Sequence, residues 1–398
     1  MKLLPPPNPN TTSFHYHGGG AANNINQLDH HCCPVKKNKV MPLLQHFFSS
    51  PSILPCKKNT NKNQNFIIKW APRMDSITTI IARPTSDAAA DLLLLRHHYR
   101  KNQRLAAQKE KLIVIMGATG AGKTKLSIEL AKRFNGEIIN SDKMQVYKGL
   151  DITTNKAPIN ERGNINHHLL GDFDPELGEL TRSDFRRLTW SKVKEIESRN
   201  KVPFLVGGST SFVHASLTDR FNPATNVFDR SNSSNSVSSE LRYDCCFLWV
   251  DVSFNVLCEY LRKRVDEMMD SGMVEELAEY YASGSLSRHP GLRNAIGVPE
   301  FYDYFNSKGY DSVDEGTLYE DAVNDIKDNT CRLAKRQIEK ILRLKTAGGW
   351  GLQRLDATSS FRKVLTSYEN EKEDWREIWT RQVVEPSFKT VKKFLEEE

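Results

Sequence analysis

The stretch Leu112–Thr124, which reads LIVIMGATGAGKT, constrains this chain more than any other segment. Its first five residues are apolar and largely β-branched, which predicts a strand that is buried on both faces. The next eight residues fit the pattern G-x-x-x-x-G-K-[ST], and Lys125–Phe134 continues as an amphipathic helix. A strand, a glycine-rich loop and a helix in this order form the context in which the pattern binds phosphate groups.

The chemistry of this loop favours a group with two or more linked phosphates. Its glycines let successive backbone N–H groups point inward, and the helix N-terminus adds partial positive charge. Lys123 adds a full positive charge, and the Thr124 hydroxyl is expected to bind Mg²⁺. The motif leaves open which phosphate compound binds and whether phosphoryl transfer follows. The predicted diphosphate-binding residues are Gly117, Ala118, Thr119, Gly120, Ala121, Gly122, Lys123 and Thr124.

Hydrophobic patterns elsewhere predict an α/β fold, with a P-loop NTPase-like parallel sheet flanked by helices and a mostly helical substrate-binding lid. Buried strands are predicted at 137–140, 202–206 and 245–252, and helices at 181–200, 255–281 (broken at 271–272) and 320–345. The expected organisation is a catalytic core at 110–253, a helical substrate-binding region at 254–346 and a C-terminal tail at 347–398.

The N-terminal part differs in composition from the rest of the chain. Residues 1–74 contain nine Lys or Arg but one acidic residue, Asp29, and show no sustained period. Such a tract cannot bury enough apolar surface to offset its ordering entropy, so we expect disorder, followed by a linker at 75–109. A basic, hydroxyl-rich and acid-poor tract is also typical of an organelle transit peptide. The alternative is a tail without a targeting function.

Overall composition limits the function classes. The net charge of +7 suits phosphorylated small molecules, although it also suits nucleic acid. The seven cysteines include no C-x-x-C and no metal-like pairing with histidine, so we expect a reducing compartment without disulfides or structural zinc. No apolar run approaches the roughly 18 residues of a membrane helix, and no membrane partner is expected.

Asp142 is the candidate for acid–base chemistry. It lies just past the carboxyl end of the strand 137–140, which is the edge where open parallel sheets bind ligands. A carboxylate beside a diphosphate can take a proton from an incoming nucleophile. The diphosphate is then the leaving group, stabilised by the loop, Lys123 and Mg²⁺.

Three other features each have two interpretations. Asp251, at the end of the strand 245–252, could reach Mg²⁺ through water or could cap the helix that begins near Phe254. His167 and His168 are interpreted as loop or packing residues rather than metal ligands, because no third ligand has a useful spacing. A basic stripe follows one face of the helix 320–345, and such stripes are usually solvated. Its members are Arg332, Lys335, Arg336, Lys340 and Arg343.

Seven ordered sequence blocks between residues 110 and 346 resemble the isopentenyltransferase family. That family includes tRNA dimethylallyltransferases and the cytokinin-forming adenylate isopentenyltransferases. The amino-acid sequence of these blocks is most similar to that of the plant adenylate enzymes. The blocks are GATGAGKT, NSDKMQVYKGLDITTNK, HHLLG, VGGSTSF, RVDEMMDSGMVEE, RNAIGVPEF and IKDNTCRLAKRQIEKI.

The resemblance implies prenyl transfer from dimethylallyl diphosphate to the N6 amine of AMP, ADP or ATP, which is the first step toward cytokinins. Asp142 matches the family's general base, and Lys123 belongs to the catalytic set. Ser209 stands where many tRNA-modifying relatives have Thr, and it would help to orient the reacting groups. Arg336 would face phosphate, which favours a functional stripe. Positioning and leaving-group stabilisation must carry most of the acceleration, because an exocyclic adenine amine is a poor nucleophile.

Several alternatives stay open. A tRNA dimethylallyltransferase would modify tRNA and leave free AMP untouched, but the chain has no cysteine after Cys331 for the zinc finger common in eukaryotic tRNA-modifying relatives. tRNA is therefore not the expected partner. A P-loop nucleotide kinase would consume ATP without a prenyl donor, and a non-enzymatic nucleotide-binding module would tolerate loss of Asp142. We expect a monomer in the chloroplast, with the cytoplasm or the mitochondrion as alternative locations.

Overall fold

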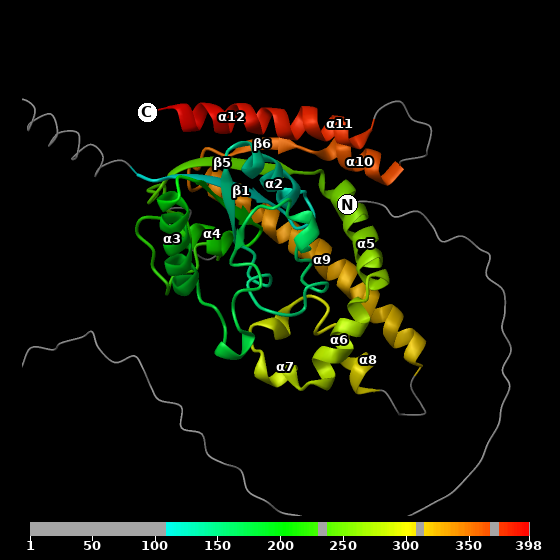
Figure 1. Cartoon of the computed structure of the whole chain (residues 1–398). Helices are drawn as coiled ribbons and strands as arrows, with labels where there is room; N and C mark the ends of the chain where they lie inside the picture. The colour runs from blue at the N-terminus through cyan, green and yellow to red at the C-terminus, as the bar shows by residue number, and fades with distance from the viewer. Residues whose placement is uncertain (1–108, 230–236, 308–313, 367–373, 398) are drawn as a thin grey trace, which may run out of the picture. The chain divides into compact units, whose positions relative to one another are not determined.

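Within the described residues, six strands form one parallel sheet in the spatial order β3-β2-β4-β1-β5-β6 (Figure 1). The predicted α/β class with a parallel sheet is confirmed, because every buried strand expected from the sequence is present. β6 joins the sheet beside β5, from the region that the sequence suggested was a tail. The strands are β1 (Lys111–Gly117), β2 (Gly136–Asn140), β3 (His167–His168), β4 (Val202–Gly207), β5 (Asp244–Asp251) and β6 (Gln353–Asp356).

The structure, a computed structural model, describes residues 109–229, 237–307, 314–366 and 374–397. All of them belong to one compact unit, Leu95–Glu398. The tract 1–74, with its predicted disorder and transit peptide, lies outside the described residues, as does nearly all of the linker 75–109.

Side chains along β1 show why both faces of the sheet are apolar. Val114 lies in a hydrophobic cluster with residues of α3 (Arg182–Ser198) and α4 (Thr210–Leu217). Ile113 and Ile115 lie in a second cluster with residues of α2 (Lys123–Arg133) and α12 (Glu385–Glu396). Successive residues of a strand point to opposite faces, so a sheet covered by helices on both sides needs a continuous apolar run.

The helices after β5 extend away from the sheet and make up the mostly helical region predicted at 254–346, called the lid below; that this region binds substrate stays a prediction. Figure 1 shows the long helix α9 running from α8 back to the sheet. The predicted break at 271–272 is present, because α5 ends at Asp270 and α6 begins at Met273. The lid helices are α5 (Phe254–Asp270), α6 (Met273–Ala282), α7 (Ser285–Arg288), α8 (Tyr302–Asn306) and α9 (Glu315–Thr346).

The C-terminal region packs against the face of the sheet that carries α2. After β6 come α10 (Thr358–Thr366), α11 (Trp375–Trp379), a π-helical turn (Thr380–Val384) and α12. Val384 and Val391 are fully buried in the cluster of that face, so this region is part of the core. Short 3₁₀ turns occur at Ile159–Glu161, Pro175–Leu177 and Leu292–Asn294. No helix in the described part of the chain is both long and apolar enough to cross a bilayer.

Candidate functional site

The parallel arrangement brings the predicted site residues to one edge of the sheet. β1 lies between β4 and β5, and the carboxyl ends of parallel strands share an edge. The glycine-rich loop follows β1, Asp142 follows β2, and Ser209 follows β4 at this edge. Segments that are far apart in the sequence therefore meet at one site, which is the edge where open α/β sheets bind ligands.

The phosphate loop has the backbone shape that its glycines permit. Gly120 and Gly122 have φ angles of 76° and 94°, in the left-handed region that favours glycine. Gly122 is the N-cap of α2, and no side chain caps this helix end. The amides of the first turn and the positive end of the helix dipole therefore suit an anion.

Lys123 follows the last glycine of the loop, and burial lowers the pKa of its ammonium group. Its Nζ donates to the Ala118 carbonyl at 2.7 Å. Burial lowers the pKa of Lys123 to about 8, the negative charge of Asp142 acts in the opposite direction, and the positive charge of Arg264 lowers it further. A diphosphate in the loop would stabilise the protonated form of this lysine.

Asp142 is held in a local turn that orients its carboxylate. The Met144 backbone N–H donates to Oδ1 of Asp142 at 3.1 Å, and the Asp142 N–H donates to Oδ1 of Asn140 at 3.2 Å. Asn140 is anchored in turn, because its Nδ2 donates to the Leu169 carbonyl at 2.9 Å. Among the described residues, this carboxylate accepts hydrogen bonds at Oδ1, so Oδ2 is available to take a proton, as a general base requires.

Ser209 supports the same turn from the next strand. Its Oγ accepts the backbone N–H of Lys143, the residue after Asp142, at 2.9 Å. The structure therefore links the β4 turn to the residue beside the candidate base. That Ser209 orients the reacting groups themselves stays a prediction.

Two residues that sequence reasoning missed touch the phosphate loop from the lid helices. Arg264 on α5 donates from Nη2 to the Thr119 hydroxyl at 3.2 Å, and burial lowers the pKa of its guanidinium. Gln337 on α9 accepts the Thr119 backbone N–H at Oε1, at 2.7 Å. Its Nε2 lies 2.5 Å from the position that a Cβ on Gly208 would occupy, which explains the glycine there.

Both missed residues lay within recognised sequence blocks. Arg264 opens the block RVDEMMDSGMVEE, and Gln337 directly follows Arg336. Arg336 itself is exposed, and its predicted contact with phosphate stays a prediction. Neighbouring residues on an α-helix point about 100° apart, so Gln337 contacts the loop from a different side of α9 than the one that carries Arg336.

Asp251 lies at the same sheet edge but is already engaged. Its Oδ2 accepts Nε of Arg354 at 2.6 Å. Of the two interpretations of Asp251, the one in which it caps α5 is wrong, because Ser253 is the N-cap residue of that helix. Water-mediated contact between Asp251 and Mg²⁺ stays a prediction, and the ion pair with Arg354 competes with it.

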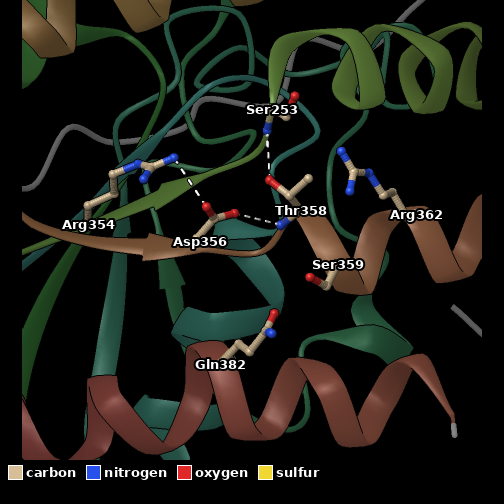
Figure 2. A pocket seen from close by; sticks show the side chains of 7 residues that line it. All are labelled: Ser253, Arg354, Asp356, Thr358, Ser359, Arg362 and Gln382. Atoms are coloured by element: carbon tan, nitrogen blue, oxygen red, sulfur yellow. Dashed lines mark hydrogen bonds and ion pairs between the residues drawn. The ribbon is translucent and has the colours of Figure 1, made fainter.

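Figure 2 shows a pocket of about 600 Å³ where β5 and β6 end. Its polar groups largely bind one another. The Ser253 N–H donates to Oγ1 of Thr358 at 2.9 Å, and the Thr358 N–H donates to Oδ1 of Asp356 at 3.0 Å. Arg354 also donates to Asp356 at 3.2 Å. Asp356 and the amides of Ser253 and Thr358 therefore already have partners within the pocket, and the negative charge of Asp356 disfavours an anion there. The lining residues are Ser253, Arg354, Asp356, Thr358, Ser359, Arg362 and Gln382.

The paired histidines have protein partners at the edge strand β3. His168 Nε2 lies 2.7 Å from Oε2 of Glu137, and His167 Nδ1 lies 2.9 Å from the Ile165 carbonyl. Burial lowers the pKa of His167. No cluster of three or more His, Cys, Asp or Glu suited to a metal occurs in the described ranges.

Comparisons with known proteins agree with this geometry. The sequence profile of the family described as "IPP transferase" matches residues 145–241 and 223–341. An adenylate isopentenyltransferase of Humulus lupulus is 56% identical over 299 residues, covering 71% of this chain and 90% of that protein. Adenylate isopentenyltransferase 1 of Arabidopsis thaliana, named chloroplastic, is 52% identical and covers 74% of this chain and 84% of its own.

Solved structures give the same fold. A eukaryotic dimethylallyltransferase acting on tRNA superposes with a TM-score of 0.57 at 26% identity, over 72% of this chain and 79% of that one. A tRNA isopentenylpyrophosphate transferase from Bacillus halodurans gives a TM-score of 0.54 at 26% identity, over 73% of this chain and 100% of its own.

The sheet order, the phosphate loop and the carboxylate beside it define an α/β P-loop protein with a helical lid. The chain belongs to the IPP transferase family, a family of prenyltransferases, and the predicted family membership is confirmed. Within that family it is similar to the plant adenylate isopentenyltransferases.

Proposed function

We propose that this protein transfers a dimethylallyl group from dimethylallyl diphosphate to the N6 amine of AMP, ADP or ATP. The observation that carries the proposal is the shared sheet edge, where Lys123 and Arg264 lie at the phosphate loop and Asp142 is near enough for its negative charge to act on both cations. In the reaction the C1–O bond of the donor breaks and a bond from N6 to C1 forms. Diphosphate leaves with the bonding electrons, and the N6 proton passes to Asp142.

The phosphate loop is the proposed site for the diphosphate. Negative charge grows on the diphosphate as the C1–O bond breaks, and the loop amides, Lys123 and Arg264 are already in place to stabilise it. Gln337 and Arg264 fix Thr119 from the lid side, so the loop keeps its shape without reorganisation during the reaction.

Mg²⁺ is the proposed cofactor, and the residues at the loop fit it. The exposed Thr124 hydroxyl at the start of α2 is a hard oxygen ligand, and Mg²⁺ prefers a few protein oxygens together with phosphate oxygens and water. Thr124 would hold the ion, with Asp251 reaching it through water once released by Arg354. When bound, Mg²⁺ would neutralise part of the diphosphate charge.

The adenine nucleotide is a better proposed acceptor than tRNA. The plant relatives named adenylate isopentenyltransferases are 41–56% identical to this chain, whereas the two solved structures described above, whose names refer to tRNA, are 26% identical to it. Plastid localisation is part of the proposal, because several of these relatives are named chloroplastic, and one is named mitochondrial. We also propose that the protein acts as a monomer.

The proposal is tested with the purified full chain, dimethylallyl diphosphate, Mg²⁺ and, separately, AMP, ADP, ATP and unmodified tRNA. Mass spectrometry would detect addition of one C5 prenyl group. Asp142→Asn should lower kcat by about 10²–10⁴-fold, because the base is lost while the shape is kept. The matched control is Asp270→Asn, an exposed aspartate of α5.

Each outcome separates the candidate functions. Prenylated free nucleotide, strongly reduced in Asp142→Asn alone, would support the proposal. Product on tRNA alone would favour a tRNA dimethylallyltransferase. ATP hydrolysis or phosphate transfer without prenylation would instead indicate a kinase.

A further inference from the structure

The carboxylate of Glu276, on helix α6 of the lid, accepts hydrogen bonds from the loop that follows the candidate base Asp142. Its Oε1 accepts the Ile152 backbone N–H at 3.0 Å. Its Oε2 accepts both the Thr153 N–H at 2.7 Å and the Thr153 hydroxyl at 2.6 Å. Hydrogen bonds to an ionised acceptor are roughly twice as strong as neutral ones, so this contact is a firm link between the lid and the core.

Packing holds the same loop from the other side. Thr153 is 6% exposed, and its methyl group lies 3.0 Å from the position of a Cβ on Gly297. Gly297 has a φ angle of 111°, which only glycine adopts without strain. The Ile152–Thr153 segment is therefore clamped between α6 and the Gly297 turn.

A second set of hydrogen bonds connects this segment to Asp142. The side chain of Gln145 donates from Nε2 to the carbonyls of Thr154 and Asn155, at 3.0 and 3.1 Å. Thr154 directly follows Thr153, which donates two hydrogen bonds to Glu276. Gln145 in turn directly follows Met144, whose backbone N–H donates to the Asp142 carboxylate.

We propose that Glu276 is a positioning residue: by fixing Ile152 and Thr153 to the lid, it sets where the Asp142 turn lies relative to the phosphate loop. The inference rests on the proposed role of Asp142 as the base. Glu276 acts through Thr153, Gln145 and the Asp142 turn, without touching the phosphate loop.

Glu276→Gln tests the proposal, because it keeps the shape but replaces one acceptor oxygen by an NH₂ group that must face an N–H donor. We expect kcat to fall about tenfold, from the loss of an acceptor to partly buried donors. The KM for dimethylallyl diphosphate should stay within about threefold, because the loop that holds the diphosphate is untouched. Glu275→Gln is the matched control, since Glu275 is the exposed neighbour on the same helix.

Two measurements test the contact of Glu276 with Ile152 and Thr153 without relying on catalytic turnover. Amide hydrogen exchange at Ile152 and Thr153 should speed up in Glu276→Gln and stay unchanged in Glu275→Gln. The affinity of the full chain for inorganic diphosphate, measured calorimetrically, should be unchanged in both variants. If Glu276→Gln does not fold, Thr153→Val, which removes one donor hydroxyl, should show a smaller loss in kcat with the same pattern.

The possible results are distinguishable. Parent-like kcat in Glu276→Gln, with faster exchange at Ile152, would overturn the positioning role but leave the proposed function intact. An equal loss of kcat and of diphosphate affinity would show a general structural role and also overturn it. A parent protein that prenylates no acceptor would overturn the proposed function and this inference together.

Discussion

The side chain of Gln337 accepts a hydrogen bond from the backbone N–H of Thr119 at 2.7 Å. Helix α9, which carries Gln337 more than 200 residues after Thr119 in the sequence, therefore holds the phosphate loop. The same side chain packs against Gly208, in the turn that carries Ser209. Gln337 thus joins two loops of the sheet edge to the lid. Because Gln337 is buried, loss of its acceptor would leave the Thr119 amide without its partner.

Substitution of Gln337 should weaken binding of the donor. We expect Gln337→Leu to raise the KM for dimethylallyl diphosphate about tenfold, since a buried N–H left unsatisfied costs about 1–3 kcal/mol. Gln337→Glu keeps an acceptor but adds negative charge beside the diphosphate, so its KM should rise further. Steady-state kinetics would measure both. Asp325→Asn, at an exposed position of the same helix, is the control, and a parent-like KM in Gln337→Leu would contradict the assignment.

The ionisation of Lys123 predicts a pH dependence of donor use. Burial lowers its pKa to about 8 from 10.5, so the lysine is charged below pH 8 and loses its proton as the pH rises through that value. Because the charged form attracts diphosphate, kcat/KM for dimethylallyl diphosphate should fall above about pH 8. The profile of the free enzyme reports this pKa. A flat profile to pH 9.5, with the protein still folded by circular dichroism, would contradict the assignment.

Lys123→Met should remove that pH dependence together with most of the activity, because methionine keeps length without charge. The residual kcat/KM of this variant should not change as the pH is raised through 8. A fall at the same pH in this variant would assign the titration to another group.

Glu137 should dominate the acid sensitivity of the fold. It is 1% exposed and accepts hydrogen bonds from Arg199, Lys201, His168 and Asn166, which together lower its pKa to about 2 despite the opposing effect of burial. A carboxylate whose pKa is depressed on folding stabilises the protein above its unfolded pKa and loses that contribution as the pH falls. The stabilisation that ionised Glu137 contributes is fully present above about pH 4.5 and disappears toward pH 2.

Glu137→Gln should therefore lower the free energy of unfolding by about 3 kcal/mol at pH 7, with a smaller difference below pH 4. Urea unfolding at the two pH values would measure it. Glu195→Gln is the control, because Glu195 shares the partner Arg199 but its side chain is 41% exposed. Equal effects at the two glutamates would contradict the argument.

Trp379 of the C-terminal region should support the phosphate loop. It is 2% exposed, and its ring lies 2.6 Å from where a Cβ on Gly122 would be. Trp379→Ala should cost about 3–5 kcal/mol of stability by leaving a cavity, and should also weaken diphosphate binding. Trp190, 46% exposed on α3, gives the control Trp190→Ala. Thermal unfolding and calorimetric titration would measure both, and an unaffected diphosphate affinity would limit Trp379 to a stabilising role.

Local sequence patterns predicted the longer helices and the four longer strands, because their signals repeat within a few residues, whereas short helices such as α4, α7 and α8 were not predicted. The apolar run before Gly117 marked β1, and the glycine near residue 272 marked the break between α5 and α6. The edge strand β3 was not recognised, because its two residues, His167 and His168, were interpreted as loop or packing residues. The final strand β6 was not recognised either. It is four residues long, and only Leu355 among them is buried, so its pattern carried little signal.

The sequence by itself determined the phosphate loop, the fold class and the candidate base, because each depends on residue types at fixed short spacing. Tertiary structure alone decided which distant side chains reach that loop. Arg264 and Gln337 meet Thr119 because α5 and α9 pack against the sheet edge, and Arg354 binds Asp251 because β6 adds beside β5. Such contacts depend on how helix faces and strand order fit together in three dimensions, which no local period specifies.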